Sequence, residues 1–426
     1  MRFITLGYLG YALAAWLLLC LPWAQTVPTP WIDHLFTSVS ALSTTGLTTV
    51  SISGSYTWFG EVIILLLIQI GGIGYMTFGS FIVFHRYGFL PDRRLDIAMS
   101  VLPVPAGLRI EHLVRGVVHF TAVIEILGAI ALYAAFRRIG VEDAAWSAVF
   151  HSISAFCTAG FSLYDTSMEV FRQDAWVNTI LAVLSYLGAI GFIVCVDLTR
   201  RLTGKSRQIT LTTRIIVGST LLLSLAGIVL FYALEPSIQA LPPRDRALAS
   251  MFQIMSALTT VGFNSIQISM LSQASLFLLI LLMVVGASPS GTGGGLKTTT
   301  FSALIGVMRS AVKGMERVYF WGKEIPPSRV LLAMASLGFY AGALIIGCYL
   351  LAIAENHEFE ALLFEASSAL GTVGLSTGIT SLLTDSGKTI IIFLMFIGRV
   401  GPLAFGLAFF HDRKHRELKE QEDLVV

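Results

Sequence analysis

The sequence contains one short motif four times. The copies read FTSVSALSTTG, FHSISAFCTAG, FQIMSALTTVG and FEASSALGTVG, and they occupy residues 36–46, 150–160, 252–262 and 364–374. Each copy fits the pattern F-x-x-x-S-A-[LF]-x-T-x-G without a gap. Four ungapped matches spread along one chain indicate a structure built from four related units.

Each copy lies between two long apolar segments. The preceding segments cover about 4–23, 112–136, 211–233 and 330–353, and the following ones about 58–84, 174–198, 273–310 and 388–411. A run of about 20 apolar residues crosses a bilayer core of about 30 Å. We therefore predict an all-α membrane protein with eight transmembrane helices, in which four span–pore helix–span repeats surround one central pore with pseudo-fourfold symmetry.

Composition agrees with this class, because 55% of the residues are hydrophobic and only 13% are charged. The apolar stretch at 3–23 is longer than the apolar region of a signal peptide, so we expect an uncleaved first span. The net charge of +2 gives no indication of a nucleic-acid partner. The four cysteines are scattered, which predicts neither a disulfide framework nor a metal site.

The repeats predict how the chain is divided. The predicted units are a first pore repeat at 1–84, a second at 85–198, a third at 199–310, a fourth at 311–411 and a cytosolic tail at 412–426. Most of the 28 lysines and arginines fall in segments that are cytoplasmic when both termini are inside. This bias follows the positive-inside rule and places the four short segments on the outer face.

The T-x-G end of each copy suits cation coordination. Selectivity filters replace the water of an ion with backbone carbonyls, and glycine reaches the positive φ that such backbone needs. The alternative is that these glycines cap ordinary short helices, but four copies on one face favour the filter. The candidate ion-binding residues, where potassium would meet backbone carbonyls, are Thr44, Thr45, Gly46, Thr158, Ala159, Gly160, Thr260, Val261, Gly262, Thr372, Val373 and Gly374.

The run GASPSGTGGGLKTTT at 286–300 interrupts the apolar segment of the third repeat. A straight helix does not continue through such a cluster of glycine and proline, so we predict a broken span with a gating loop. The run does not match a phosphate-binding loop, because Leu296 separates Gly295 from Lys297. The candidate gate residues are Gly286, Ser288, Gly291, Gly293, Gly294, Gly295, Lys297 and Arg399.

Charged residues within the predicted spans allow alternatives. Arg399 is either a positive charge near the pore axis or a structural residue that pairs with a carboxylate or caps carbonyls. Lys297 is either a gate element or an anchor that extends toward the interface. Glu125, Glu61 and Asp197 serve either packing and topology or transport.

The four T-x-G ends, LIQIGGIGYMTF at 67–78, MFIGRVGPLAF at 395–405 and the glycine-rich run at 286–300 together resemble the Trk/Ktr/HKT superfamily of potassium transporters. Over essentially the whole chain the sequence is most similar to the Ktr-type (KtrB-like) membrane subunit. The resemblance implies potassium uptake, often stimulated by sodium, by a homodimer in the bacterial inner membrane. It also implies a cytosolic, KtrA-like RCK ring that binds ATP or ADP, since we predict no nucleotide site on this chain.

Three functions follow from these patterns. The first is potassium translocation, which the glycine at all four filter positions favours in the superfamily. The second is a sodium-preferring or weakly selective transporter, because each filter segment is short. The third, a membrane-embedded enzyme, is disfavoured because the motifs carry no nucleophile–base arrangement. The charged loops at 85–110, 199–213 and 311–329 suit a docked partner or simple solvation equally well.

Overall fold

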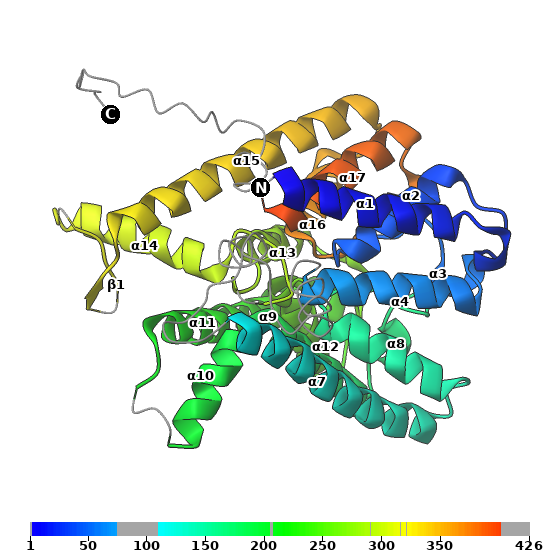
Figure 1. The fold of residues 1–426 in the computed structure, drawn as a ribbon, viewed down its shortest axis with the longest axis horizontal. Helices are drawn as coiled ribbons and strands as arrows, with labels where there is room; N and C mark the ends of the chain where they lie inside the picture. Colours follow the sequence, from blue (N-terminus) through cyan, green and yellow to red (C-terminus); the bar gives the residue numbers. More distant parts are fainter. Residues whose placement is uncertain are drawn as a thin grey trace.

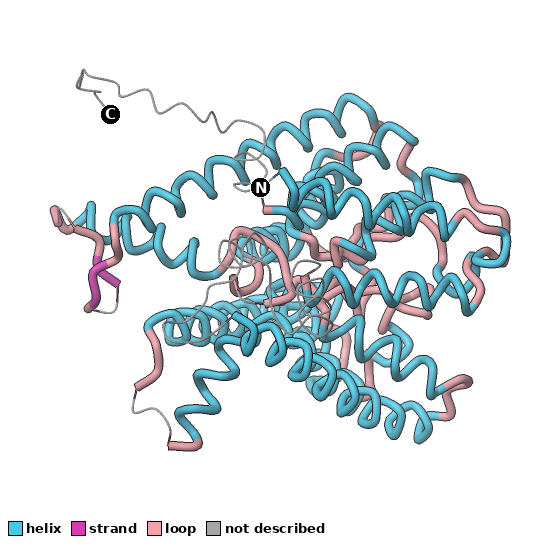
Figure 2. Tube along the Cα trace, viewed as in Figure 1, coloured by secondary structure: helices cyan, strands magenta, loops and turns pink. Residues whose placement is uncertain are grey.

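The computed structural model describes residues 2–74, 110–204, 208–289, 291–315, 317–320 and 322–401. Within these ranges the chain is mostly helical, with one small hairpin formed by β1 (Tyr319–Phe320) and β2 (Lys323–Glu324) (Figures 1 and 2). The predicted loop at 85–110 lies outside the described residues except for Ile110, and the tail at 412–426 lies wholly outside them.

One pattern of helices occurs four times: a first helix, a short second helix and a third helix. The first helices are α1 (Arg2–Leu19), α7 (Ile110–Ile139), α11 (Leu211–Leu234) and α15 (Pro327–Ala354). The short second helices, which contain the repeated motif, are α2 (Trp31–Leu42), α8 (Ala144–Phe156), α12 (Pro243–Thr259) and α16 (Phe359–Gly371). The third helices are α4 (Trp58–Ile73), α9 (Ala175–Ile190), α13 (Gln273–Val285) and α17 (Asp385–Val400).

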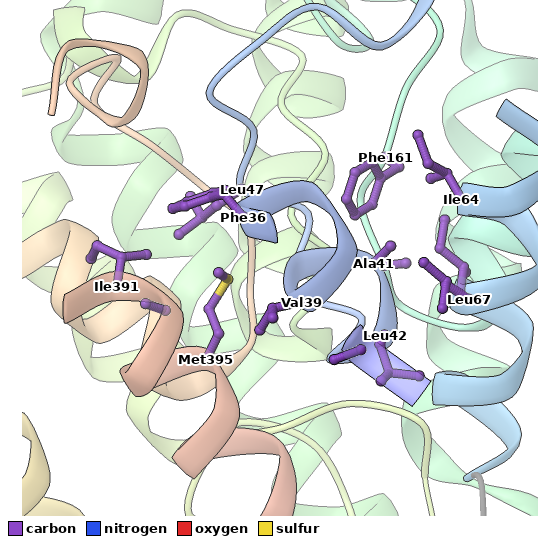
Figure 3. Packing of buried hydrophobic residues seen from close by; sticks show 14 of the residues in the cluster. Phe36, Val39, Ala41, Leu42, Leu47, Ile64, Leu67, Phe161, Ile391 and Met395 are labelled. Atoms are coloured by element: carbon purple, nitrogen blue, oxygen red, sulfur yellow. The ribbon is translucent and has the colours of Figure 1, made fainter. Parts of the chain in front are cut away.

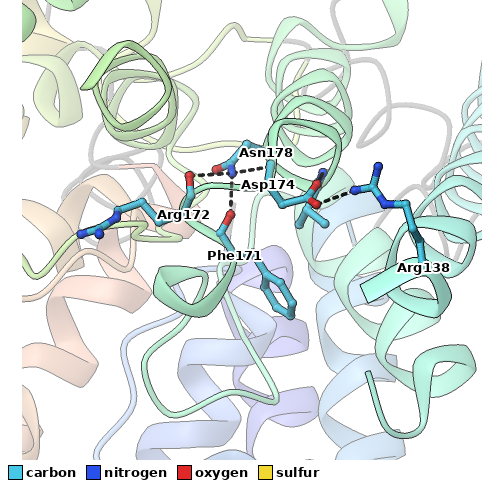
Figure 4. Close-up of polar contacts among 6 residues, drawn as sticks. Arg138, Phe171, Arg172, Asp174 and Asn178 are labelled. Atoms are coloured by element: carbon cyan, nitrogen blue, oxygen red, sulfur yellow. Dashed lines mark hydrogen bonds and ion pairs between the residues drawn. The ribbon is translucent and has the colours of Figure 1, made fainter. Parts of the chain in front are cut away.

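The remaining described helices are short connections or continuations. They are η1 (Pro22–Ala24), α3 (Ile52–Ser55), η2 (Glu169–Phe171), α10 (Phe192–Leu202), η3 (Pro236–Ile238), η4 (Ile268–Met270), α14 (Thr298–Val312) and η5 (Thr380–Leu382). The turn that contains η2 is held by Asn178, whose Nδ2 donates to the carbonyl oxygens of Phe171 at 2.8 Å and Asp174 at 2.7 Å (Figure 4). Arg138 of α7 forms an ion pair with Asp174, which ties this turn to the first helix.

All four third helices begin in the same way. A side-chain oxygen of the N-cap residue accepts a hydrogen bond from the backbone N–H three residues later. The four N-cap residues are Thr57, Asp174, Ser272 and Thr384. Such caps satisfy N–H groups that have no partner inside the helix, so each helix start is encoded locally.

The short helices occupy the centre and each packs against three neighbours. Each touches the first and third helix of its own repeat and the third helix of the preceding repeat, since α8 packs on α4, α12 on α9 and α16 on α13. The packing of α2 on α17 joins the fourth repeat to the first. The four repeats are therefore arranged in a closed cycle.

The central core is apolar and densely shared between repeats. One cluster surrounds α2: Phe36 and Val39 lie on the side of Ile391 and Met395 of α17, and Ala41 lies on the side of Leu67 of α4 (Figure 3). The outer helices instead expose apolar side chains, and four of them on α11, Leu221, Leu222, Leu225 and Val229, are each more than half exposed. Such a surface is stable against lipid and not against water.

Three described helices are long and apolar enough to cross a bilayer: Arg115–Ile139, Leu211–Leu234 and Pro327–Ala354. The segments Leu6–Leu19, Trp58–Ile73 and Gln273–Val285 form shorter apolar helices. The apolar segment at 174–198, which we expected to form one span, is broken in the structure, because α9 and α10 are bent by 97° at Gly191. Gly191 has a φ of +87°, which ends α9.

Candidate functional site

The T-x-G segments adopt the same unusual backbone in all four repeats. The threonines have left-handed φ values: Thr44 +52°, Thr158 +50°, Thr260 +59° and Thr372 +48°. The glycines are also positive: Gly46 +89°, Gly160 +67°, Gly262 +84° and Gly374 +98°. A left-handed conformation costs a β-branched residue about 1–2 kcal/mol. Strain repeated at four equivalent positions indicates a functional constraint.

The glycines of the four T-x-G segments, predicted to form the filter, make a ring of backbone contacts. A Cβ added to each glycine would collide with the carbonyl oxygen of the residue before the glycine of the next repeat. The contacts run from Gly46 to Ala159, from Gly160 to Val261, from Gly262 to Val373 and from Gly374 to Thr45. The ring closes in chain order, and any larger residue would push a neighbouring carbonyl out of place.

The motif serines tether the filter segments, a role that sequence reasoning missed. Ser40 Oγ donates to the Leu47 carbonyl oxygen at 2.7 Å and accepts from the Gly46 N–H at 3.1 Å. Ser154 Oγ donates to the Phe161 carbonyl oxygen at 2.8 Å, and the Gly374 N–H donates to Ser368 Oγ at 3.0 Å. The fourth serine, Ser256, is buried and its Oγ has no hydrogen-bond partner among the described residues. The serine at the fifth position of every motif copy was the feature of the sequence from which this role could have been predicted.

Three of the filter threonines contact the segments predicted to form the gate. Arg399 donates to Thr44 Oγ1 at 2.9 Å, and the Gly294 N–H donates to Thr260 Oγ1 at 3.0 Å. Thr158 Oγ1 lies 3.1 Å from Thr292 Oγ1. The predicted filter and the predicted gating loop are therefore in direct contact through hydroxyl groups.

The loop between α13 and α14 is folded against the end of α9. The Ser288 N–H donates to the Ala189 carbonyl oxygen at 3.1 Å, and Ser288 Oγ donates to that of Ile190 at 2.7 Å. The backbone at Gly286 (φ +64°) and Gly295 (φ +77°) permits the two reversals of the loop. Gly291, Gly293 and Gly294 each pack against backbone or side-chain atoms that leave no room for a Cβ.

The two cations predicted to lie within spans, Arg399 and Lys297, both bind backbone carbonyls. Arg399 Nη1 donates to the Thr292 carbonyl oxygen at 2.6 Å, and Nη2 donates to that of Gly71. Lys297 Nζ donates to the carbonyl oxygens of Gly293 at 2.5 Å and Gly294 at 3.3 Å. In the described part of the chain, neither cation lies in an ion pair with a carboxylate. Arg399 thus caps carbonyls and also joins the first repeat to the loop.

The three acidic residues considered for transport occupy different surroundings. Glu61 accepts from Trp146 Nε1 at 2.6 Å near the start of α4. Asp197 accepts from the N–H and the hydroxyl of Thr210, both at 2.9 Å. Glu125 is buried behind the second filter segment, where Gln69 Nε2 donates to it at 2.9 Å. The described residues contain no cluster of histidine, cysteine, aspartate or glutamate that could hold a metal ion.

The sequence analysis also missed a repeated pair of glycines at the ends of the third helices. Every third helix ends at a glycine of positive φ: Gly74 +85°, Gly191 +87°, Gly286 +64° and Gly401 +92°. In three repeats another glycine stands three residues earlier and packs on a carbonyl group in the last turn of the short helix, in the pairs Gly71–Leu42, Gly188–Phe156 and Gly398–Leu370. The repeated spacing G-x-x-G was visible in the sequence.

The fold and site define a helical, multi-pass membrane protein of the transporter class. The sequence profile of the family described as "TrkH: Cation transport protein" matches residues 17–415. Because the match covers nearly the whole chain, the chain belongs to this family.

Several curated proteins are similar over almost their full length. The chain is 34% identical to "Ktr system potassium uptake protein B" of Vibrio alginolyticus, over 100% of this chain and 94% of the relative. It is 36% identical to "Ktr system potassium uptake protein D" of Bacillus subtilis, over 95% of this chain and 92% of the relative. It is 32% identical to "Potassium/sodium uptake protein NtpJ" of Enterococcus hirae, over 93% and 90% of the two chains.

A solved structure has the same fold. The crystal structure of the potassium transporter TrkH from Vibrio parahaemolyticus superposes with a TM-score of 0.72, covering 94% of this chain and 83% of that chain. The two sequences are 22% identical, so the structural similarity is evidence for the fold alone.

Proposed function

We propose that this chain is the ion-translocating subunit of a potassium uptake system, in which cations permeate a filter made of four T-x-G segments. The observation that carries the proposal is the ring in which each filter glycine meets a backbone carbonyl of the next repeat. A ring of backbone carbonyls replaces the hydration shell of a monovalent cation. The choice of potassium as the ion rests on the relatives, which are named as potassium uptake proteins.

The architecture in this proposal is four span–pore helix–span repeats, with eight transmembrane helices around one pseudo-fourfold axis. The repeats are 1–84, 85–198, 199–310 and 311–411. The cyclic packing of the short helices on the third helices of the preceding repeats supports this arrangement. Thr44 to Gly46 and the three equivalent tripeptides line the filter, and the 286–297 loop with Arg399 forms the gate beneath it.

Potassium is the preferred ion in this proposal because glycine occupies every filter position. The alternative is a sodium-preferring or weakly selective transporter, and one relative is named as a potassium/sodium uptake protein. Each segment supplies only a short filter, so we expect some sodium permeation. Flux measurements with each ion alone separate the two possibilities.

We also propose that the chain works as a homodimer in the bacterial inner membrane, with both termini in the cytoplasm and with sodium as a stimulating ion. A cytosolic ring of RCK subunits that binds ATP or ADP would regulate it. The names of the relatives, which describe a Ktr system, support a multi-component transporter. Potassium uptake by deficient cells, with and without a co-expressed ring subunit, tests this regulation.

The filter is tested by Gly46→Ser, which adds a side chain where the Ala159 carbonyl oxygen lies. We expect the potassium-to-sodium uptake ratio in reconstituted vesicles to fall by about tenfold or more, because the displaced carbonyl can no longer coordinate the ion. Gly378→Ser is the matched control, since Gly378 also has a positive φ, +97°, but has open space beside it. Both variants carry the same backbone penalty.

Two results would count against the proposal. If Gly46→Ser kept the ion preference of the unmodified chain, the filter assignment would be wrong. If the unmodified chain moved neither potassium nor sodium in vesicles, transport itself would be excluded. The enzyme alternative would then be reconsidered.

A further inference from the structure

A carboxyl group is buried behind the second filter segment, where three helices meet. Glu125 of α7 is only 7% exposed. Its Oε2 accepts a hydrogen bond from Nε2 of Gln69 on α4 at 2.9 Å, and its Oε1 accepts from Sγ of Cys157, the C-cap residue of α8, at 3.5 Å. The carboxyl therefore joins the third helix of the first repeat to the pore helix of the second.

The cluster leads directly into the filter. Cys157 precedes Thr158, and Thr158 Oγ1 donates to the Cys157 carbonyl oxygen at 2.8 Å. Thr158 also contacts Thr292 of the 286–297 loop, whose hydroxyl donates to the Phe156 carbonyl oxygen at 3.1 Å. A movement of Cys157 would therefore move both the start of the filter segment and a contact of the loop.

Cys157 has little freedom to move while Glu125 is present. On its other side lies Gly72, and a Cβ added to Gly72 would collide with the side chain of Cys157. Cys157 itself is fully buried. The thiol is thus held between the backbone of α4 and the carboxyl of α7.

Among the residues that the structure describes, this support is present in one repeat of the four. The residues equivalent to Cys157 are Ser43, Thr259 and Gly371, and within the described ranges the two hydroxyls bond to atoms of their own repeat only. The residue equivalent to Glu125 in the first repeat is Ala12, because Ser38 donates to the Ala12 carbonyl oxygen as Ser152 does to that of Glu125, both at 2.7 Å. The second quarter of the ring is therefore braced by a side chain that the first lacks.

We propose that Glu125 is a positioning residue that sets ion selectivity by fixing the second filter segment through Cys157. The inference rests on the proposed function of the T-x-G ring. A filter carbonyl that is free to shift inward would coordinate a smaller cation well, so a loosened segment admits sodium more easily. Glu125 does not touch the ion; it restricts the carbonyls that do.

The experiment compares potassium and sodium uptake by purified, reconstituted variants. Glu125→Leu removes both acceptors, and we expect the potassium-to-sodium ratio to fall by about three- to tenfold, the scale set by losing a buried hydrogen-bonded partner. Glu125→Gln retains the shape and can still bond to Gln69 and Cys157, so we expect a ratio within about twofold of the unmodified chain. Glu61→Gln, which changes another buried carboxyl whose Oε2 accepts from Trp146 in the first turn of α8, is the control and should leave the ratio unchanged.

Cys157 provides a second route if Glu125→Leu does not fold. Cys157→Ala removes the thiol donor, and Cys157→Ser restores a donor at the same place. We expect the alanine variant to lose selectivity and the serine variant to keep most of it. In the double variant of Glu125→Leu with Cys157→Ala the two losses should not add, because the residues act in one chain of contacts.

Several outcomes would overturn the inference. One is an unchanged ratio in folded Glu125→Leu, and another is full additivity of the double variant. A third is a Glu125→Gln ratio as low as that of Glu125→Leu, which would assign the effect to charge and not to position. These failures differ from failure of the proposed function, in which the unmodified chain would itself transport no cation.

Discussion

At the scale of single residues, the proposed filter contains backbone conformations that local preferences alone would disfavour. Thr44 and its three equivalents hold a left-handed backbone, and the glycines two residues later hold positive φ values. The motif serines offset this cost in three repeats by bonding to the backbone of the filter or the residue that follows it. In the third repeat Ser256 makes no such bond to any described residue.

This difference predicts unequal effects of the same substitution. Ser154→Ala removes the donor to the Phe161 carbonyl oxygen, and a hydrogen bond of this kind contributes about 1 kcal/mol. We expect the potassium-to-sodium uptake ratio to fall by about threefold to fivefold. Ser256→Ala is the matched control and should change the ratio by less than about twofold. Equal losses in both variants would contradict the tethering role.

Arg399 gives a second prediction at this scale. Arg399→Gln removes the charge and the donors to Thr292 and Gly71, and so removes one of the contacts that hold the 286–297 loop against the proposed filter. We expect ungated potassium flux through reconstituted vesicles to rise several-fold. Arg399→Lys keeps the charge, but one ammonium cannot replace the guanidinium fork, so an intermediate flux is expected. If flux and gating were unaltered in Arg399→Gln, the residue would have a structural role only.

At the scale of helices, two repeats use a buried glutamate to join the end of the first helix to the start of the third. Glu355 accepts from the N–H of Thr384 at 2.9 Å and from its hydroxyl at 2.7 Å. Glu235 accepts from the same two groups of Ser272, at 3.1 Å and 2.9 Å. The negative charge at a helix N-terminus also interacts favourably with the helix dipole. These contacts fix where α13 and α17 begin, and both helices pack on the short helix of their own repeat.

Glu355→Ala should therefore lower stability. Charged hydrogen bonds of this kind contribute about 1.5–3 kcal/mol each, so we expect a fall of several degrees in the melting temperature of the detergent-solubilised protein. Glu358→Ala is a close control, because Glu358 is exposed and its side chain makes no capping bond. A melting temperature of Glu355→Ala equal to that of the control would exclude the bracing role.

At the scale of the whole molecule, the cycle of repeats must be closed between the last repeat and the first. The packing of α2 on α17 provides most of this seam, and an ion pair reinforces it near the start of both helices. Lys388 Nζ lies 2.6 Å from Asp33 Oδ1, and the two side chains are only 12% and 5% exposed. A pair so well shielded from water differs from a surface ion pair.

Breaking this seam should destabilise the ring as a unit. Lys388→Met leaves Asp33 as a buried, unpaired charge. We expect this to lower the free energy of unfolding by about 3–5 kcal/mol. The double variant of Lys388→Met with Asp33→Asn should recover much of that loss. Arg317→Met, which breaks the exposed pair with Glu324, should change the melting temperature by little. Equal melting temperatures for Lys388→Met and the unmodified chain would show that apolar packing alone closes the cycle.

Periodicity and repetition predicted much of this molecule, and three-dimensional neighbours account for the rest. The motif located the four short helices and their T-x-G ends, because those positions need the same residue types in every copy. The bend at Gly191 was not predicted, since the apolar run at 174–198 continues through it. The partners of Glu125 could not be predicted from the sequence either, because Gln69 and Cys157 approach it only when helices of two repeats pack together.

The position of Arg399 has a consequence for how such a molecule can evolve. In an assembly of four identical subunits, an arginine at this position would appear four times, and the four charges would repel a cation that entered the proposed pore. Here the equivalent positions of the other third helices carry Gly72, Ala189 and Val284. Joining the four quarters in one gene permits a single positive charge where symmetry would impose four, so each quarter can acquire its own task.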